Sequence, residues 1–93
     1  MFEIIFTVRA KKALLKYGRS GSFPKKKFRR VMNLLRAGNA LPQSLQDHQL
    51  KGNLSDFREF HLASDILVRY ERDEAVFLIT ISKIGTHAEL FGE

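Results

Sequence analysis

The sequence contains no cysteine, and this absence removes two common ways of stabilising a chain of 93 residues. Neither a disulfide nor a zinc site with thiolate ligands can form, so the core has to come from the packing of apolar side chains. Thiol chemistry is excluded on the same ground. The lack of cysteine fits a reducing compartment, and we expect a cytoplasmic protein.

Long apolar runs are missing as well. Residues 1–8 are largely apolar but few, and basic residues follow them, whereas a signal peptide has its basic residues first. No segment approaches the length of a membrane span. We therefore expect no membrane partner.

Two groups of glycine-containing motifs are also absent. The sequence has neither a P-loop nor G-x-G-x-x-G, so it does not indicate a nucleotide cofactor, and we expect no cofactor of any kind. It has no G-x-S-x-G nucleophile elbow either, which argues against a serine hydrolase of the α/β type.

Acidic residues are scarce in the first part of the chain. Residues 1–36 hold eleven Lys and Arg and one acid, whereas residues 37–93 hold five basic and nine acidic residues. The whole chain carries a formal charge of +6 and has a pI of about 10.0. A basic part joined to a mildly acidic one predicts a surface for a polyanion, with nucleic acid the first candidate and an anionic membrane the second.

Two amphipathic helices are expected in the basic part. Thr7 can cap the first helix, and Pro24 suits the first turn of the second. In both helices apolar residues recur at i, i+3, i+4 and i+7. These residues are Ala10, Ala13, Leu14 and Tyr17 in the first helix and Phe28, Val31, Met32 and Leu35 in the second. Because the connection is short, the pattern predicts an antiparallel helix hairpin.

Four segments have the composition of strands: residues 2–6, 57–62, 66–71 and 76–81. Ile66, Val68 and Tyr70 alternate onto one face, and residues 76–81 are apolar on both faces, as in a central strand. A tight turn is expected at Asp73-Glu74, an irregular segment at 39–55 and a helical turn at 85–91.

The order of these elements is βααβββ. It predicts a single α+β domain over residues 1–93, with the two-helix antiparallel hairpin packed on one face of a small, mostly antiparallel four-stranded sheet.

The three histidines, His48, His61 and His87, all lie in the second half of the chain. Cleavage of RNA without a metal needs a base for the ribose 2′-OH, an acid for the departing 5′-oxygen and a cation near the phosphate. The histidines, Asp65 and Lys83 supply those groups. The simpler interpretation is that these histidines are surface or packed residues without a catalytic role. A metal site made of the histidines and Asp65 is less favoured, because none of the spacings gives helical i, i+4 ligands of the H-E-x-x-H kind.

The basic run in the second helix has two readings. Lys25, Lys26, Arg29 and Arg30 either contact nucleic acid or form a solvated helix face. Phe28 interrupts the run, but its helical phase assigns it to the core. Phe91, near the end of the chain, either anchors the tail or stacks on a base.

The second half of the chain resembles the YafQ-like toxins, a branch of the RelE/ParE superfamily. The matching residues span positions 41–92. They are Asp47-His48-Gln49-Leu50, Gly52, Phe57-Arg58-Glu59-Phe60-His61, Asp65, Tyr70 and Gly85-Thr86-His87-Ala88-Glu89-Leu90-Phe91. The helical half resembles the superfamily only in its layout, since the order βααβββ is that of the RelE/ParE fold.

The resemblance implies a type II toxin that cleaves translated mRNA in the ribosomal A site. It also implies a cognate antitoxin that wraps around the toxin, with a monomer when free and a larger complex with antitoxin. The implied active-site residues are His48, His61, Asp65, His87 and the C-terminal aromatic Phe91.

Residue chemistry adds roles to these implied positions. His87 is the leading general acid, and Asp65 with His48 or His61 supplies or orients the base. Lys83 neutralises the scissile phosphate. The basic helices, with Lys25, Lys26, Arg29 and Arg30, would grip ribosomal RNA.

Two positions depart from the family pattern. Ile66 stands where tryptophan is frequent, and Lys83 where arginine is frequent, so an indole and a planar bidentate cation are lost. Two other functions therefore stay open: a ParE-like toxin that inhibits DNA gyrase without catalysis, and an RNA-binding module that does not cleave.

Overall fold

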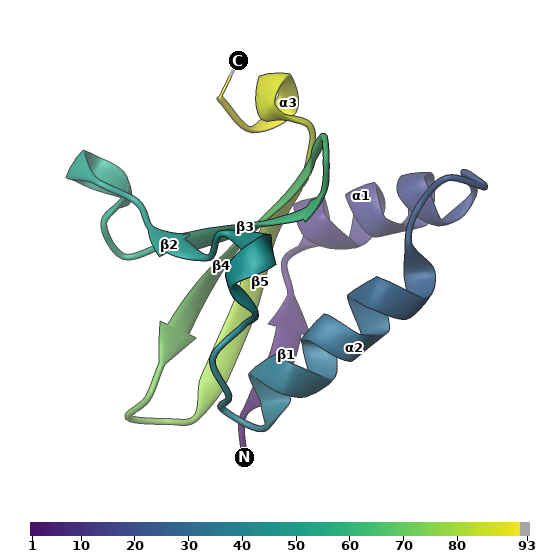
Figure 1. Ribbon diagram of the computed structural model, residues 1–93. Coiled ribbons are helices and arrows are strands. Elements are labelled where there is room, and N and C mark those ends of the chain that lie inside the picture. Colours follow the sequence, from purple (N-terminus) through teal and green to yellow (C-terminus); the bar gives the residue numbers. More distant parts are fainter. Residues whose placement is uncertain (92–93) are drawn as a thin grey trace.

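A computed structural model describes residues 1–91 (Figure 1). These residues form one twisted sheet, helices and two short 3-10 turns. The strands are β1 (Glu3–Phe6), β2 (His48–Gln49), β3 (Arg58–Ala63), β4 (Ile66–Asp73) and β5 (Leu78–Gly85). The helices are α1 (Val8–Gly18), α2 (Lys25–Arg36) and α3 (His87–Phe91), and the turns are η1 (Gln43–Leu45) and η2 (Gly52–Leu54). No helix within residues 1–91 is long and apolar enough to cross a membrane.

The strands form one sheet in the order β1-β5-β4-β3-β2. β1 runs parallel to β5, and the other neighbours are antiparallel. The predicted α+β class and the mostly antiparallel sheet are confirmed. The strand count is corrected from four to five, because β2 forms within residues 39–55, which were expected to be irregular. A strand of two residues shows no periodicity that would reveal it in the sequence.

The turn between β4 and β5 is wider than predicted. β4 continues to Asp73 and β5 begins only at Leu78, so the expected two-residue turn at Asp73-Glu74 is wrong. Phe77 adopts a left-handed backbone conformation with φ of 53°, which any sequence-based rule disfavours for a bulky residue. Val76 and Phe77 are 63% and 55% exposed, so they belong to the turn and not to the central strand.

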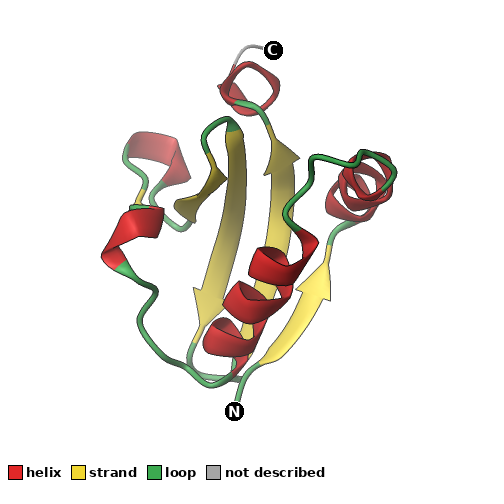
Figure 2. Ribbon diagram, turned by 45° about the vertical axis from the view of Figure 1, so that its right-hand side comes forward, coloured by secondary structure: helices red, strands yellow, loops and turns green. Residues whose placement is uncertain are grey.

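Two helices, α1 and α2, cover one face of the sheet. They run in opposite directions, as predicted, but are inclined to each other (Figure 1). Figure 2 shows α1 nearly end-on and α2 lengthwise. Phe23 in the connection is buried, and its ring packs on Tyr17 at 6.1 Å and on Phe28 at 5.7 Å. These aromatic rings fill the space between the adjoining ends of α1 and α2 and hold the two helices at an open angle.

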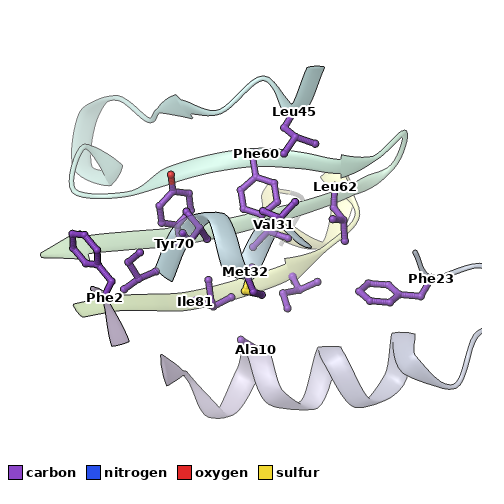
Figure 3. Close-up of a cluster of buried hydrophobic side chains, with 14 residues drawn as sticks. Phe2, Ala10, Phe23, Val31, Met32, Leu45, Phe60, Leu62, Tyr70 and Ile81 are labelled. Carbon is purple, nitrogen blue, oxygen red and sulfur yellow. The ribbon is translucent and has the colours of Figure 1, made fainter. Parts of the chain in front are cut away.

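The core lies between α2, α1 and this face of the sheet (Figure 3). Val31, Met32 and Leu35 of α2 are buried there, as the helical stripe predicts, whereas α1 buries only Ala10 completely. Thr7 caps α1 as predicted: its Oγ1 accepts the Ala10 N–H at 3.1 Å. The expected common face of Ile66, Val68 and Tyr70 is confirmed, because all three pack in this core.

Candidate active site

The register of the sheet gathers polar residues on the face opposite the helices. His48 of β2 pairs with Glu59, Glu59 with Arg69, and Arg69 with Lys83, so one row crosses four strands. Cross-strand partners share a face of the sheet. His61 lies on the same face as Glu59, two positions along β3. The register thereby brings His48 and His61 to one side of the molecule and places the backbone of Lys83 at the end of the same row.

A β-bulge in β4 and β5 sets this row. The pairing shifts between Arg69 and Tyr70, so that Tyr70 lies opposite Ile81 while Arg69 lies opposite Lys83. Ser82 is the extra residue, and its hydroxyl donates to the Arg69 carbonyl at 3.1 Å. Bulges change the direction of neighbouring side chains. Here the bulge keeps Tyr70 in the core and brings the backbone of Lys83 beside Arg69.

A buried ion pair lies in the middle of the row. Arg69 Nε and Glu59 Oε2 are 3.3 Å apart, and the two residues are only 3% and 2% exposed. Within residues 1–91 Arg69 Nη2 is buried without an acceptor. The sequence does not predict this buried pair, because a charged residue alternating with apolar ones normally marks the solvent side of a strand.

The short helix α3 completes this face. His87 and Phe91 are four positions apart and therefore lie on one side of the helix, with ring centroids 5.2 Å apart. The Phe91 ring also covers the Arg69 guanidinium at 4.8 Å. Because Phe91 remains 47% exposed, it is a partly open aromatic surface next to a histidine and a buried cation.

Glu89 fastens α3 from its other side. Its Oε1 accepts the Thr86 N–H at 2.8 Å, and its own N–H donates to Thr86 Oγ1 at 3.1 Å, which is a capping box. The Tyr17 hydroxyl of α1 donates to the same carboxylate, and Lys16 Nζ lies 3.3 Å from Oε2. A Cβ on Gly85 would come within 2.7 Å of Oε1, so a larger residue there would displace the Glu89 carboxylate.

The contact between Tyr17 of α1 and Glu89 of α3 shifts the pKa of both side chains. The hydrogen bond from Tyr17, followed by that from the Thr86 backbone, lowers the pKa of Glu89 to about 2. Burial, reinforced by the Glu89 carboxylate, raises the pKa of Tyr17 to about 12. The pair therefore consists of a carboxylate and a neutral phenol throughout the range in which histidine titrates.

A stability measurement tests the Glu89 contacts. A carboxyl whose pKa is lower in the folded than in the unfolded chain stabilises the fold above its unfolded pKa, here about 4.5, and loses that contribution as the pH falls through about 2. Over this window wild-type protein should lose more stability than Glu89→Gln in parallel thermal melts. Solvent screening keeps the difference small, because the side chain is 43% exposed. Superimposable pH profiles would contradict the assignment.

Asp47, Arg58 and Tyr70 hold β2 against β3. Asp47 Oδ2 accepts from Arg58 Nε and Nη2 at 3.2 and 2.9 Å, and its Oδ1 accepts from the Tyr70 hydroxyl at 2.9 Å. Burial, reinforced by Asp47, raises the pKa of Tyr70. The next residue, His48, donates from Nδ1 to the Gln46 carbonyl at 2.7 Å, which leaves Nε2 to act as an acceptor. The network thus fixes the strand that presents His48.

Asp65 lies at the end of the sheet, in the exposed turn between β3 and β4. Its charge contributes to the raised pKa of Tyr17, so it is near the α1 and α3 contact. Figure 1 shows α3 at the same end of the sheet as this turn. No hydrogen bond joins Asp65 to a histidine within the described residues. In the same part of the chain no three His, Cys, Asp or Glu side chains are grouped closely enough to hold a metal ion, so the weaker metal-site alternative does not fit the geometry.

The basic residues fall on two surfaces. The first surface is on α2, on the helix side of the sheet and away from the histidines, and it carries Lys25, Lys26, Arg29 and Arg30. Three of these residues lie around one hollow: Lys25, Lys26 and Arg30. Lys83 lines a cleft of about 330 Å³ between α1 and α3. The other cations of this cleft, Arg9, Lys12 and Lys16, all come from α1. Their i, i+3, i+7 spacing places them on one helix face and is the sequence signal that could have identified them.

Comparison with known proteins identifies relatives along nearly the whole chain. Residues 2–92 match the family described as "Bacterial toxin of type II toxin-antitoxin system, YafQ". A metal-bound toxin from Helicobacter pylori is 33% identical, with a TM-score of 0.89 over 98% of this chain and 100% of that one. YafQ in the DinJ–YafQ complex from E. coli is 25% identical, with a TM-score of 0.85 over 99% of this chain and 100% of that one. No curated protein sequence matches. The chain belongs to the YafQ family of type II toxins.

Proposed function

We propose that this toxin is an mRNA interferase, an endoribonuclease that cleaves mRNA on the ribosome by metal-independent acid–base chemistry. The observation that carries the proposal is the pairing of His87 with the partly exposed ring of Phe91, which lies over the buried Arg69 guanidinium. A proton-transfer group and an aromatic surface for a base adjoin there. A toxin that inhibits gyrase only by binding has no use for this combination.

The reaction needs one proton removed and one delivered. His48 or His61, with Asp65 supplying or orienting the base, takes the proton of the ribose 2′-OH. The 2′-oxygen then attacks phosphorus, forms a 2′,3′-cyclic phosphate and breaks the bond to the 5′-oxygen. His87 protonates that leaving oxygen. Lys83 neutralises charge on the phosphoryl oxygens. Phe91, which lies over the buried Arg69 guanidinium, stacks on a base of the substrate.

The family and the relatives also support a protein partner. The E. coli relative forms a complex with DinJ, and we infer that this toxin is neutralised by a cognate antitoxin of its own. It would act as a single domain over residues 1–93, as a monomer in the cytoplasm when free and in a larger complex when bound to antitoxin.

Mapping of mRNA ends tests the function directly. We would induce the toxin in growing bacteria and map the 5′ ends of translated mRNAs, with His87→Ala as the active-site control. New ends at in-frame codon positions, absent with His87→Ala, are the expected result. Growth arrest with intact mRNA would reject the nuclease and support one of the two binding functions, gyrase inhibition or RNA binding without cleavage.

Charge reversal on α2 tests the contact with ribosomal RNA. Changing Lys26, Arg29 and Arg30 to Glu is expected to weaken ribosome binding and to flatten its dependence on salt. Each lost phosphate contact lowers the slope of log K against log salt by about 0.7 to 0.9. The corresponding Gln variants separate the lost attraction from added repulsion. Unchanged affinity and slope in correctly folded variants would show that α2 is only a solvated face.

A further inference from the structure

Helix α3 carries two residues of the proposed site but has only five residues, His87–Phe91. A helix of this length is not stable by itself, because its nucleation costs more than so few hydrogen bonds return. Its Leu90 is buried, which holds it against the sheet but does not fix its rotation about its own axis. The direction in which His87 points therefore depends on other contacts.

Glu89 supplies contacts that fix this rotation. In a helix successive side chains are about 100° apart, so Glu89 lies about 200° around the axis from His87 and from Phe91. The carboxylate thus leaves α3 on the side away from the site. It accepts from Tyr17 of α1, from the Thr86 backbone and from Lys16. Turning α3 about its axis would move His87 and Phe91 together and would break these bonds.

Tyr17 is the partner that belongs to a rigid element. Its ring packs on the buried Phe23 at 6.1 Å, so its hydroxyl is held at the end of α1. Lys16, by contrast, is an exposed flexible side chain, and exposed ion pairs contribute little. The hydrogen bond between Tyr17 and Glu89 is consequently the contact that ties α3 to the helical layer.

We propose that Tyr17 and Glu89 are positioning residues for the cleavage reaction, which set the orientation of His87 and Phe91 without contacting RNA. This inference rests on the proposed function of the site. Misplacing a reacting group by about 1 Å can lower a rate on the order of 100-fold. Loss of the Tyr17–Glu89 bond should therefore lower kcat, while KM changes little because the basic surfaces that bind RNA are intact.

Four variants test the proposal in ribosome-dependent cleavage assays. Tyr17→Phe removes only the hydroxyl, and Glu89→Ala removes the whole carboxylate. Glu89→Gln retains an oxygen that accepts from Tyr17 and Thr86, so it should recover part of the activity. Glu74→Gln is the matched control, because Glu74 is an exposed carboxylate in an ion pair with Arg72, 3.0 Å away, on the turn between β4 and β5.

The expected order of kcat is wild type and Glu74→Gln, then Glu89→Gln, then Tyr17→Phe and Glu89→Ala at about 10- to 100-fold below wild type. Similar kcat values for all variants would overturn the proposal. A proportional rise of KM with unchanged kcat would also overturn it, because it would place Glu89 or Tyr17 in RNA binding.

NMR of the Arg69 side chain gives a readout that does not depend on cleavage. The Phe91 ring lies 4.8 Å from the Arg69 guanidinium carbon on β4, so it shifts the Arg69 side-chain protons, and turning α3 in Glu89→Ala or Tyr17→Phe should reduce that shift. If the wild type cleaves no RNA, the proposed function fails, whereas the NMR result still decides the positioning role. Unaltered Arg69 signals in both variants would refute that role even in an active nuclease.

Discussion

Replacing His87 by glutamine is expected to lower the rate of mRNA cleavage by about 100- to 10,000-fold, the range over which a general acid contributes. His87 is exposed at the start of α3 and has no side-chain hydrogen bond within residues 1–91, so the fold does not depend on it. Glutamine retains hydrogen-bonding groups but cannot deliver a proton near neutral pH. The loss should therefore appear in kcat and not in ribosome binding.

Single-turnover cleavage on purified ribosomes programmed with a defined mRNA measures this effect. Ribosome affinity and melting temperature serve as controls for binding and folding. His48→Gln and His61→Gln provide the comparison for the base. The variant that lacks the base should lose the acidic limb of the pH–rate profile, whereas His87→Gln should lose the alkaline limb. Wild-type cleavage by His87→Gln would transfer the role of general acid to another group.

The sequence predicts those parts of the fold that depend on short-range periodicity. The stripe of Val31, Met32 and Leu35 on α2 and the alternation of Val68 and Tyr70 on β4 are repeated patterns, and each places its residues in the core. The Thr7 cap is equally local, since its partner Ala10 lies three residues away. Such features follow from the geometry of a helix or a strand alone.

The features that the sequence does not predict arise from contacts between distant parts of the chain. β2 exists because Asp47 is anchored by Arg58 and Tyr70, which lie 11 and 23 positions away. The aromatic packing around Phe23 sets the open angle between α1 and α2, and no local pattern records it. The three histidines were recognised by residue type, but their common face depends on a register that includes a bulge.

Tyr17 shows how a local pattern can be right and still incomplete. The helical stripe assigns it to the core, and its ring does pack against the core. Its hydroxyl nevertheless reaches Glu89, 72 positions further along the chain. An amphipathic pattern reports the side of the helix on which a residue lies, but it does not report which polar group meets the end of a long side chain.

The largest effect on stability is expected from breaking the Glu59–Arg69 pair. Glu59→Leu or Arg69→Met alone would leave one charge buried without its partner, and such changes cost about 3 to 5 kcal/mol. Both side chains are almost completely inaccessible, so neither water nor salt can replace the missing partner. Urea unfolding of the two single variants measures the loss. If each single variant loses less than about 1 kcal/mol of unfolding free energy, the pair contributes no more than an exposed ion pair does. That result would contradict the burial of the pair.

The double variant Glu59→Leu/Arg69→Met separates the stability of the pair from its function. A buried ion pair replaced by apolar residues of similar volume is often neutral or stabilising by about 1 to 4 kcal/mol, because no charge has to be desolvated. We therefore expect a stable double variant that has lost cleavage, since the cation beneath Phe91 is gone. A stable double variant with full activity would limit Arg69 to packing. A double variant as unstable as the sum of the two single ones would show that the two side chains are not coupled. If the ion pair proves dispensable for folding but required for cleavage, the buried charges are explained by their contribution to the site. The row from His48 to Lys83 would then belong to the reactive surface.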